Sequence, residues 1–154
     1  PERHGAIEQL LSEGDYGYAH CGSYFLADNP LFIDGNAEQL GKTIMSLLNN
    51  GMYAIAKKYG KKAYPAEIGL ALESKDGQAV IRLYDNGVGI EQSILDKIFD
   101  PFFTTKTTGE AAGIGLYLSK EIILNHHGQI AVRSEKDELT EFTITLPLWE
   151  EKSV

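Results

Sequence analysis

The sequence predicts an α+β fold: a two-layer α/β sandwich with a mixed, mostly antiparallel sheet and helices on one face. A long segment near the middle of the chain repeats apolar residues with the period of an amphipathic helix. Several later segments alternate apolar and polar residues and fall in pairs, which is typical of β-hairpins. The chain has 154 residues, enough for one domain with a hydrophobic core and too few for two comfortable ones.

Composition narrows the classes of protein to which the chain can belong. Hydrophobic residues make up 43% and aromatic residues 10%, which indicates a folded protein rather than a disordered one. The net charge of −8 argues against nonspecific binding to nucleic acid or to an anionic membrane, so we expect neither partner. The single cysteine, Cys21, excludes an internal disulfide bond and fits a reducing compartment. No signal peptide is visible and no apolar run approaches the roughly 20 residues of a membrane span, so we expect a cytoplasmic location.

The first part of the chain is expected to lead into the domain. A short helix is predicted over Glu2–Glu13, and brief strands at Tyr16–Ala19, Tyr24–Ala27 and Leu31–Ile33. We expect three units: a leading helix and strand at 1–30, the main domain at 31–148 and a polar tail at 149–154. Because the chain begins at Pro1 rather than Met, we expect a piece of a larger protein, and a membrane segment elsewhere in that parent remains open.

The longest expected element is a helix over Ala37–Tyr59, which Gly60 ends. Its apolar stripe comprises Leu40, Ile44, Leu47, Leu48, Gly51 and Ile55. Two alternating segments follow, Ile68–Leu72 and Ala79–Tyr84. The dipeptide Asp76-Gly77 between them is a hairpin turn signal, so we expect an antiparallel pair.

The second half of the chain is expected to hold two helices and a final hairpin. A short helix over Glu91–Phe99 stops at Pro101, and a longer one over Gly113–His126 follows a polar loop. The last hairpin pairs Gln129–Arg133 with Glu141–Leu146.

The run Asp85-Asn86-Gly87-Val88-Gly89-Ile90 carries the first chemical signal. A carboxylate at the end of a strand can accept a hydrogen bond from an exocyclic amine such as that of adenine. Two glycines separated by one residue let a flat ring approach the backbone without a Cβ clash. Ile90 offers an apolar wall. Alone, this motif is equally consistent with a glycine-rich turn after a strand.

A second glycine pair, Gly113-Ile114-Gly115-Leu116, opens the later helix. The N–H groups and positive dipole end of such a helix favour phosphate. The motif is no Walker loop, since no Gly-Lys-Ser/Thr follows, and no Rossmann fingerprint, since no strand precedes it. A flexible loop before an ordinary helix is the alternative.

Two further groups of residues suit a nucleotide. Ser46, Asn50 and Tyr53 form one stripe on the long helix, where an Asn oxygen can coordinate Mg²⁺. Phe102 and Phe103 form an apolar pair that directly precedes a polar loop, Thr104-Thr105-Lys106. The charge of Lys106 could bind terminal phosphates. Taken singly, Asn50 is better explained as a surface asparagine, and the second group also fits a surface loop anchored by aromatics with a solvated lysine.

In this order, the four groups resemble the N box, first glycine box, F box and second glycine box of sensor histidine kinases. These kinases are Bergerat-fold ATPases, like gyrase, MutL and Hsp90. The resemblance covers about Phe32–Pro147, and its specificity lies in the order and spacing of four motifs. The stretch PFFTTK and the run GIGLYLSK look especially like the nitrogen-sensor type of kinase.

The resemblance implies a site for ATP and Mg²⁺. Asp85 would bind the adenine amine, the glycines after it would admit the base, and Asn50 would hold Mg²⁺ against the phosphates. An ATP lid would run from Thr104 to Ala112 and end at the second glycine pair. The implied ATP-binding residues are Asn50, Tyr53, Asp85, Gly87, Gly89, Ile90, Phe102, Lys106, Gly113, Gly115 and Leu116.

The sequence departs from this pattern at several positions. Ser46 stands where kinases often have Asn and where the hydrolysing relatives carry a Glu base, which favours a kinase over a hydrolase. Tyr53 stands where many kinases place a basic residue, so Lys57 or, better, Lys106 would supply the cation for the phosphates. Gly51 replaces the usual Ala and Ala111 a usual lid Gly.

The chain contains no segment like the phosphoacceptor of these kinases. His4 lacks the flanking acid and the Arg-x-Pro, and is interpreted as a solvated helix histidine. His126 and His127 are expected at a helix end, where a cation suits the dipole. The resemblance therefore implies transfer of the γ-phosphoryl group to a histidine on a dimerising helical domain of the same parent, and later to a response regulator. The fragment alone would not phosphorylate itself.

Two other functions stay open at this point. One is a Bergerat ATPase that hydrolyses ATP to drive dimerisation, which Ser46 disfavours. The other is a regulatory binding module whose nucleotide gates a partner, as in anti-sigma-factor kinases. The replacements at Ser46, Gly51 and Tyr53 keep the second alternative open.

Overall fold

A computed structural model describes residues 22–25, 31–60, 66–101, 103 and 115–149 of the chain. Its elements are β1 (Gly22–Phe25), α2 (Ala37–Tyr59), β2 (Ile68–Lys75), β3 (Gln78–Asp85), the 3-10 helix η1 (Gln92–Lys97), α3 (Gly115–Asn125), β4 (Gln129–Glu135) and β5 (Leu139–Pro147). The helix expected at Glu2–Glu13 and the strand expected at Tyr16–Ala19 lie outside the described residues.

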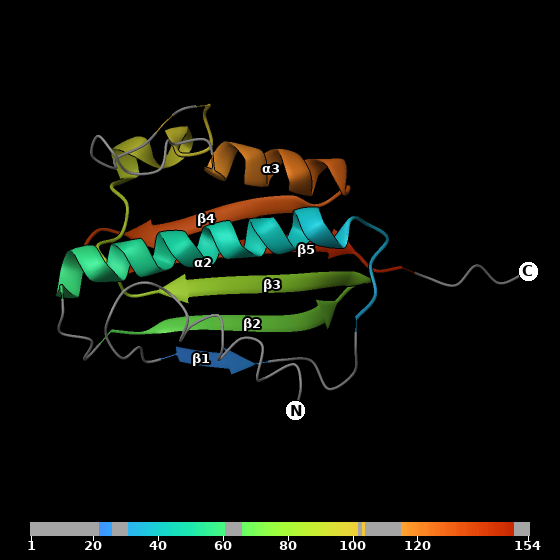
Figure 1. Ribbon diagram of the computed structural model, residues 1–154, viewed down its shortest axis with the longest axis horizontal. Coiled ribbons are helices and arrows are strands. Elements are labelled where there is room, and N and C mark those ends of the chain that lie inside the picture. Colours follow the sequence, from blue (N-terminus) through green and yellow to red (C-terminus); the bar gives the residue numbers. More distant parts are fainter. Residues whose placement is uncertain (1–21, 26–30, 61–65, 102, 104–114, 150–154) are drawn as a thin grey trace, which may run out of the picture.

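The strands of the described part form one five-stranded sheet in the order β1-β2-β3-β5-β4. β1 pairs with β2 in parallel, and every other neighbouring pair is antiparallel. Figure 1 shows α2 and α3 on one face of this sheet. The predicted architecture, a mostly antiparallel sheet under a layer of helices, is confirmed. No helix among the described residues has the length and apolar character needed to cross a membrane.

The bounds of α2 agree with the sequence prediction because both ends are set by local signals. The Asn36 side chain accepts a hydrogen bond from the Gln39 N–H at 3.0 Å and so caps the first turn. Gly60 takes a positive φ of 61° and donates its N–H to the Ala56 carbonyl at 2.8 Å. Asparagine before the apolar stripe and glycine after it are the signals that fix this helix.

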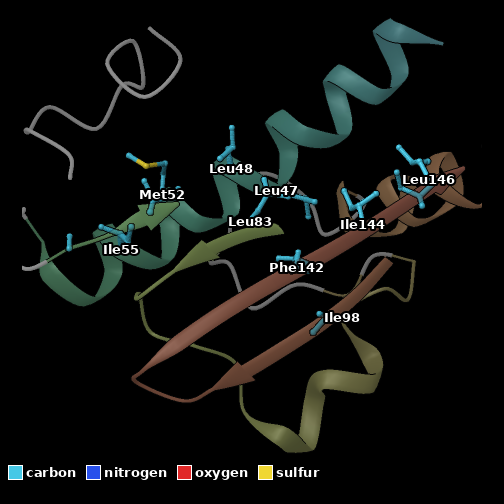
Figure 2. Packing of buried hydrophobic residues seen from close by; sticks show 12 residues of the cluster. Leu47, Leu48, Met52, Ile55, Leu83, Ile98, Phe142, Ile144 and Leu146 are labelled. Atoms are coloured by element: carbon cyan, nitrogen blue, oxygen red, sulfur yellow. The ribbon is translucent and has the colours of Figure 1, made fainter. Parts of the chain in front are cut away.

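The hydrophobic core lies between α2 and the sheet. Figure 2 shows members of this core on α2, β3 and β5. Ile144 of β5 is fully buried at the centre. The labelled core residues are Leu47, Leu48, Met52, Ile55, Leu83, Ile98, Phe142, Ile144 and Leu146. The predicted apolar stripe is confirmed, since its members are buried or pack against this cluster.

The two predicted hairpins are confirmed, and their strands are somewhat longer than expected. β2 and β3 are joined by Asp76 and Gly77 alone, with φ values of 53° and 77°. Such a two-residue turn with two positive φ angles matches the right-handed twist of the strands, which explains the Asp-Gly dipeptide. Because Ile68 pairs with Asp85, the last residue of β3 lies beside the first residue of β2.

Some expected elements differ in the structure. The strand predicted at Leu31–Ile33 is wrong, because this segment has no regular structure and Phe32 is 66% exposed. Its carbonyl accepts a hydrogen bond from the Trp149 N–H at 2.7 Å, but no ladder follows. The strand expected at Tyr24–Ala27 overlaps β1 at Tyr24 and Phe25, and its last two residues lie outside the described part of the chain. The expected helix at Glu91–Phe99 is the shorter η1, and α3 ends at Asn125.

His126 ties the end of α3 to the start of α2. Its Nε2 accepts a hydrogen bond from the Asn36 N–H at 2.9 Å, and Nδ1 lies 2.7 Å from the Ile122 carbonyl oxygen. His126 and His127 directly follow the last residue of α3, so their predicted place at a helix end is confirmed.

Candidate functional site

A cavity of about 1300 Å³ opens between α2, the end of β3 with the loop after it, and the start of α3. Seven of the predicted site residues line it: Asn50, Tyr53, Asp85, Gly89, Ile90, Gly115 and Leu116. Asn50 and Asp85, which come from different elements, thus share one cavity. Gly87 lies beside it, outside the cavity wall. Phe102, Lys106 and Gly113 lie outside the described residues.

Asp85, the last residue of β3, lines this cavity and is only 5% exposed. Its Oδ1 accepts a hydrogen bond from the Gly87 N–H at 2.9 Å. Burial raises the pKa of Asp85 to about 7, against the opposing effects of the Gly87 N–H and of the Lys58 ammonium. Near neutral pH the free protein therefore holds this carboxyl in both protonation states.

The structure explains the need for glycine at positions 87 and 89 differently from the sequence prediction. A Cβ on Gly87 would lie 2.5 Å from the backbone carbonyl carbon of Ala54 in α2. A Cβ on Gly89, whose φ is 71°, would collide with the Glu135 carbonyl oxygen. Both positions need glycine because other backbone segments pack against them. The expected approach of a base to these glycines stays a prediction.

The backbone of this loop is fastened to three neighbouring segments. The Val88 N–H donates to the Ala54 carbonyl at 3.3 Å, and the Val88 carbonyl accepts from the Asp137 N–H at 2.6 Å. The Ile90 N–H donates to Ser134 Oγ at 2.8 Å. α2 and the turn between β4 and β5 therefore hold the loop in one conformation beside the cavity.

The other end of the cavity is where α2 and α3 meet. Asn50 and Tyr53 line the cavity from α2, one and two helical turns beyond Ser46, as their spacing predicts. A Cβ on Gly115 would lie 3.0 Å from Ser46 Oγ, so glycine allows α3 to begin close to α2. The first N–H groups of a helix have no partner within it, and its N-terminus favours anions. This end of the cavity therefore suits phosphate groups.

Sequence reasoning missed Thr140 and Ser134. Thr140 lines the cavity directly across the β3–β5 ladder from Asp85, and both missed side chains are buried. Ser134 Oγ donates to the Leu139 carbonyl at 2.7 Å, so it accepts from Thr140 Oγ1 at 2.8 Å. The Thr140 oxygen then keeps its lone pairs for a ligand or water. The alternation of residues along β5 could have indicated Thr140, because it lies two residues before Phe142 and so faces the same side of the sheet.

The cavity wall contains lysines, but the described residues form no cluster of metal ligands. Lys42, Lys57 and Lys136 line it, and Lys136 Nζ pairs with Glu91 Oε1 at 2.7 Å. Lys57, one of the two lysines considered for the phosphates, is thus in the wall. Within the described part of the chain, no group of three or more His, Cys, Asp or Glu side chains could hold a metal ion. A cation here would therefore depend on Asn50, water and the oxygens of a ligand.

Comparison with known sequences agrees with this geometry. Residues 35–150 match the family of histidine kinase-, DNA gyrase B- and HSP90-like ATPases. The signal transduction histidine-protein kinase AtoS of Escherichia coli is 39% identical over 122 residues, which cover 79% of this chain and 19% of AtoS. Sporulation kinase D of Bacillus subtilis is 32% identical over 139 residues, which cover 90% of this chain and 26% of that kinase. The chain thus spans about a quarter or less of these relatives.

Solved structures share the fold. The catalytic domain of histidine kinase ThkA matches with a TM-score of 0.71 at 22% identity, covering 95% of this chain and 88% of that one. The mycobacterial sensor histidine kinase MprB matches with a TM-score of 0.74 at 21% identity, covering 94% and 91%. Because the family match extends over most of the chain, this protein belongs to the histidine kinase-, DNA gyrase B- and HSP90-like ATPases.

Proposed function

We propose that the chain is the catalytic domain of a sensor histidine kinase, which holds Mg·ATP in this cavity and donates its γ-phosphoryl group to a histidine elsewhere. One observation carries the proposal: Asn50 and Asp85 line a single cavity, as a base-binding acid and a metal-binding amide must. The relatives AtoS and sporulation kinase D, both named as kinases, support the choice of reaction. Residues 31–148 would form the nucleotide-binding unit.

Base recognition falls to Asp85. In its ionised form the carboxylate accepts one hydrogen bond from Gly87 and has capacity for another from the adenine amine. Thr140 offers a second polar atom at the same end of the cavity, directly or through water. Ile90 supplies an apolar wall for the ring.

Phosphate binding falls to the opposite end. Mg²⁺ bound with ATP would neutralise charge on the phosphate oxygens, and the Asn50 oxygen is the ligand this chain offers to it. The start of α3 beside Ser46 orients N–H groups toward the phosphates. Phe102, Lys106 and Gly113 would complete the enclosure. The likeness of PFFTTK and GIGLYLSK to the nitrogen-sensor type is the basis for placing the kinase in that subgroup.

The reaction needs a nucleophilic histidine, and none is among the described residues that line the cavity. Phosphoryl transfer depends on positioning and charge neutralisation, so the domain would present the terminal phosphate in a fixed pose. A helical domain of the same parent would bring the histidine, and a response regulator would receive the phosphoryl group from it. This division of labour predicts ATP binding without self-phosphorylation.

Calorimetric titration with a non-hydrolysable ATP analogue, with and without Mg²⁺, tests the proposal. We expect Mg²⁺-dependent binding, and loss of about a hundredfold in affinity for Asp85→Asn, because a hydrogen bond to a charged acceptor is lost. The exposed Asp96→Asn on η1 is the matched control and should bind normally. Unchanged affinity in Asp85→Asn would remove the base-binding role of this residue.

ATP hydrolysis is the second candidate, and the described cavity disfavours it. Among the described lining residues the carboxylates are Asp85, Glu91 and Asp137, all at or beside the loop that follows β3. None lies on the stretch of α2 around Ser46, where a water attacking the terminal phosphate would need a base. Steady release of phosphate by the purified chain would nevertheless establish hydrolysis.

A further inference from the structure

Lys58 joins three parts of the nucleotide site from outside the cavity. It lies in the last turn of α2, and its side chain is not part of the cavity wall. Its Nζ donates to the Asp137 carbonyl at 2.6 Å and to the Asn86 carbonyl at 3.2 Å. The same ammonium lies 5.2 Å from the centre of the Tyr59 ring. One cation thus links α2 to two loops that are far apart in sequence.

The first of these loops directly follows the base-binding acid. Asn86 separates Asp85 from Gly87, whose N–H holds the carboxylate. The Asn86 carbonyl also accepts a hydrogen bond from the Tyr59 hydroxyl at 3.2 Å. Its N–H, which belongs to the preceding peptide unit, donates to the Glu67 carbonyl at 3.1 Å. The position of the Asn86 carbonyl therefore sets where the Gly87 N–H points.

The second loop is the turn between β4 and β5. Asp137 adopts a positive φ of 65°, and its N–H donates to the Val88 carbonyl at 2.6 Å. The neighbouring Glu135 carbonyl packs against the Cα of Gly89. This turn therefore packs against residues 86–89, which form the glycine loop, and Lys58 fastens the turn to α2.

We propose that Lys58 is a positioning residue for recognition of the purine 6-amino group, holding the glycine loop and the β4–β5 turn in register on α2. The inference rests on the proposed function, because it concerns the same site. Lys58 makes no contact with the ligand in this account and acts through the Asn86 and Asp137 carbonyls. Its positive charge also lowers the pKa of Asp85, which burial raises.

The proposal separates base recognition from phosphate binding, so two ligands test it. ATP and purine riboside triphosphate, which lacks the 6-amino group, are titrated with Mg²⁺ into the wild-type chain and into Lys58→Met. We expect the variant to bind ATP about tenfold more weakly, equivalent to about 1.4 kcal/mol, and purine riboside triphosphate less than about twofold more weakly. Lys58→Arg retains a cation with several donors and should restore most of the selectivity.

Controls distinguish this outcome from a loss of folding or of charge. Lys75→Met, at the far end of β2, should leave both affinities unchanged. Lys57→Met removes a lysine of the cavity wall and should leave the ratio of the two affinities unchanged, whatever it does to both. Tyr59→Phe removes the second donor to the Asn86 carbonyl and should reduce the same ratio by a smaller factor.

The outcomes are separable. If the wild-type chain binds neither triphosphate, the proposed function fails. If it binds both and Lys58→Met weakens them equally, or weakens neither, the positioning role is refuted while the proposed function stands. Should Lys58→Met not fold, the ratio in Tyr59→Phe decides, and an unchanged ratio there overturns the inference.

Discussion

The ionisation of Asp85 should make nucleotide affinity depend on pH near neutrality. Burial raises the pKa of this carboxyl to about 7, and the ionised carboxylate is a stronger hydrogen-bond acceptor for the adenine amine than the protonated acid. If the protonated form does not bind, the dissociation constant at pH 6 is about tenfold that at pH 8. One pH unit below the pKa corresponds to about 1.36 kcal/mol of lost binding free energy.

The assay is a titration from pH 6 to pH 8.5 with ATP and with purine riboside triphosphate. Because the two ligands carry the same triphosphate, the ratio of their affinities cancels the ionisation of the phosphates. The preference for ATP should rise with pH and level off above about pH 8. A preference that stays constant over this range would show that Asp85 is ionised throughout or does not bind the adenine amine.

The same pKa predicts a pH-dependent difference in stability. Because the native pKa is raised above 3.8, the folded protein binds more protons than the unfolded chain between about pH 4 and pH 7. The stabilisation from protonated Asp85 is complete below pH 3.8 and is lost as pH rises through 7. A shift from 3.8 to about 7 corresponds to about 4 kcal/mol.

Urea unfolding of the wild type and of Asp85→Asn measures this difference, since the amide does not titrate. The free energy of unfolding of the wild type, relative to the variant, should fall by about 4 kcal/mol between pH 4 and pH 8. The reasoning is refuted if the difference between the two proteins is the same at both pH values.

Three further predictions have defined outcomes. Gly87→Ala forces a Cβ onto the backbone of α2 and should lower the free energy of unfolding by about 3 kcal/mol, whereas Gly41→Ala, in open space on the same helix, should raise it by up to about 1 kcal/mol in urea unfolding. His126→Ala should cost about 1–2 kcal/mol in the same assay, because two hydrogen bonds are lost, and an equal cost for His127→Ala would contradict the role given to the first. Asn50→Ala should abolish the gain in ATP affinity that Mg²⁺ produces, and a persistent gain in calorimetry would place the metal elsewhere.

Local signals explain which elements could be predicted from sequence. α2 was predicted with its observed bounds because Asn36 and Gly60 act within one helical turn of its ends. The β2–β3 hairpin was predicted because the Asp76-Gly77 dipeptide alone selects the turn. Leu31–Ile33 has the composition of a strand, but no neighbouring strand pairs with it in the described structure. Strand propensity needs a partner and a buried face to become a strand.

The site could be predicted only in part, because much of it depends on register. The convergence of Asn50 and Asp85 followed from the order of four motifs. Thr140 could not be placed until the antiparallel ladder of β3 and β5 set it opposite Asp85. The packing of Gly87 against α2 likewise depends on contacts between residues more than thirty positions apart. A short stretch of sequence cannot predict long-range register of this kind, because the register depends on segments far apart in the chain.

Burial of Asp85 has opposite consequences for stability and for recognition. The low-polarity surroundings that raise its pKa also exclude the water that would compete for a hydrogen bond with the nucleobase. The Gly87 N–H and the Lys58 ammonium offset part of the cost of the charge, and the incoming amine supplies a further donor. If only the ionised form binds, binding at pH 7 releases a proton from about half of the molecules. A carboxylate that were fully ionised before binding would need more donors from the protein, and those donors would occupy the oxygens that the base must reach.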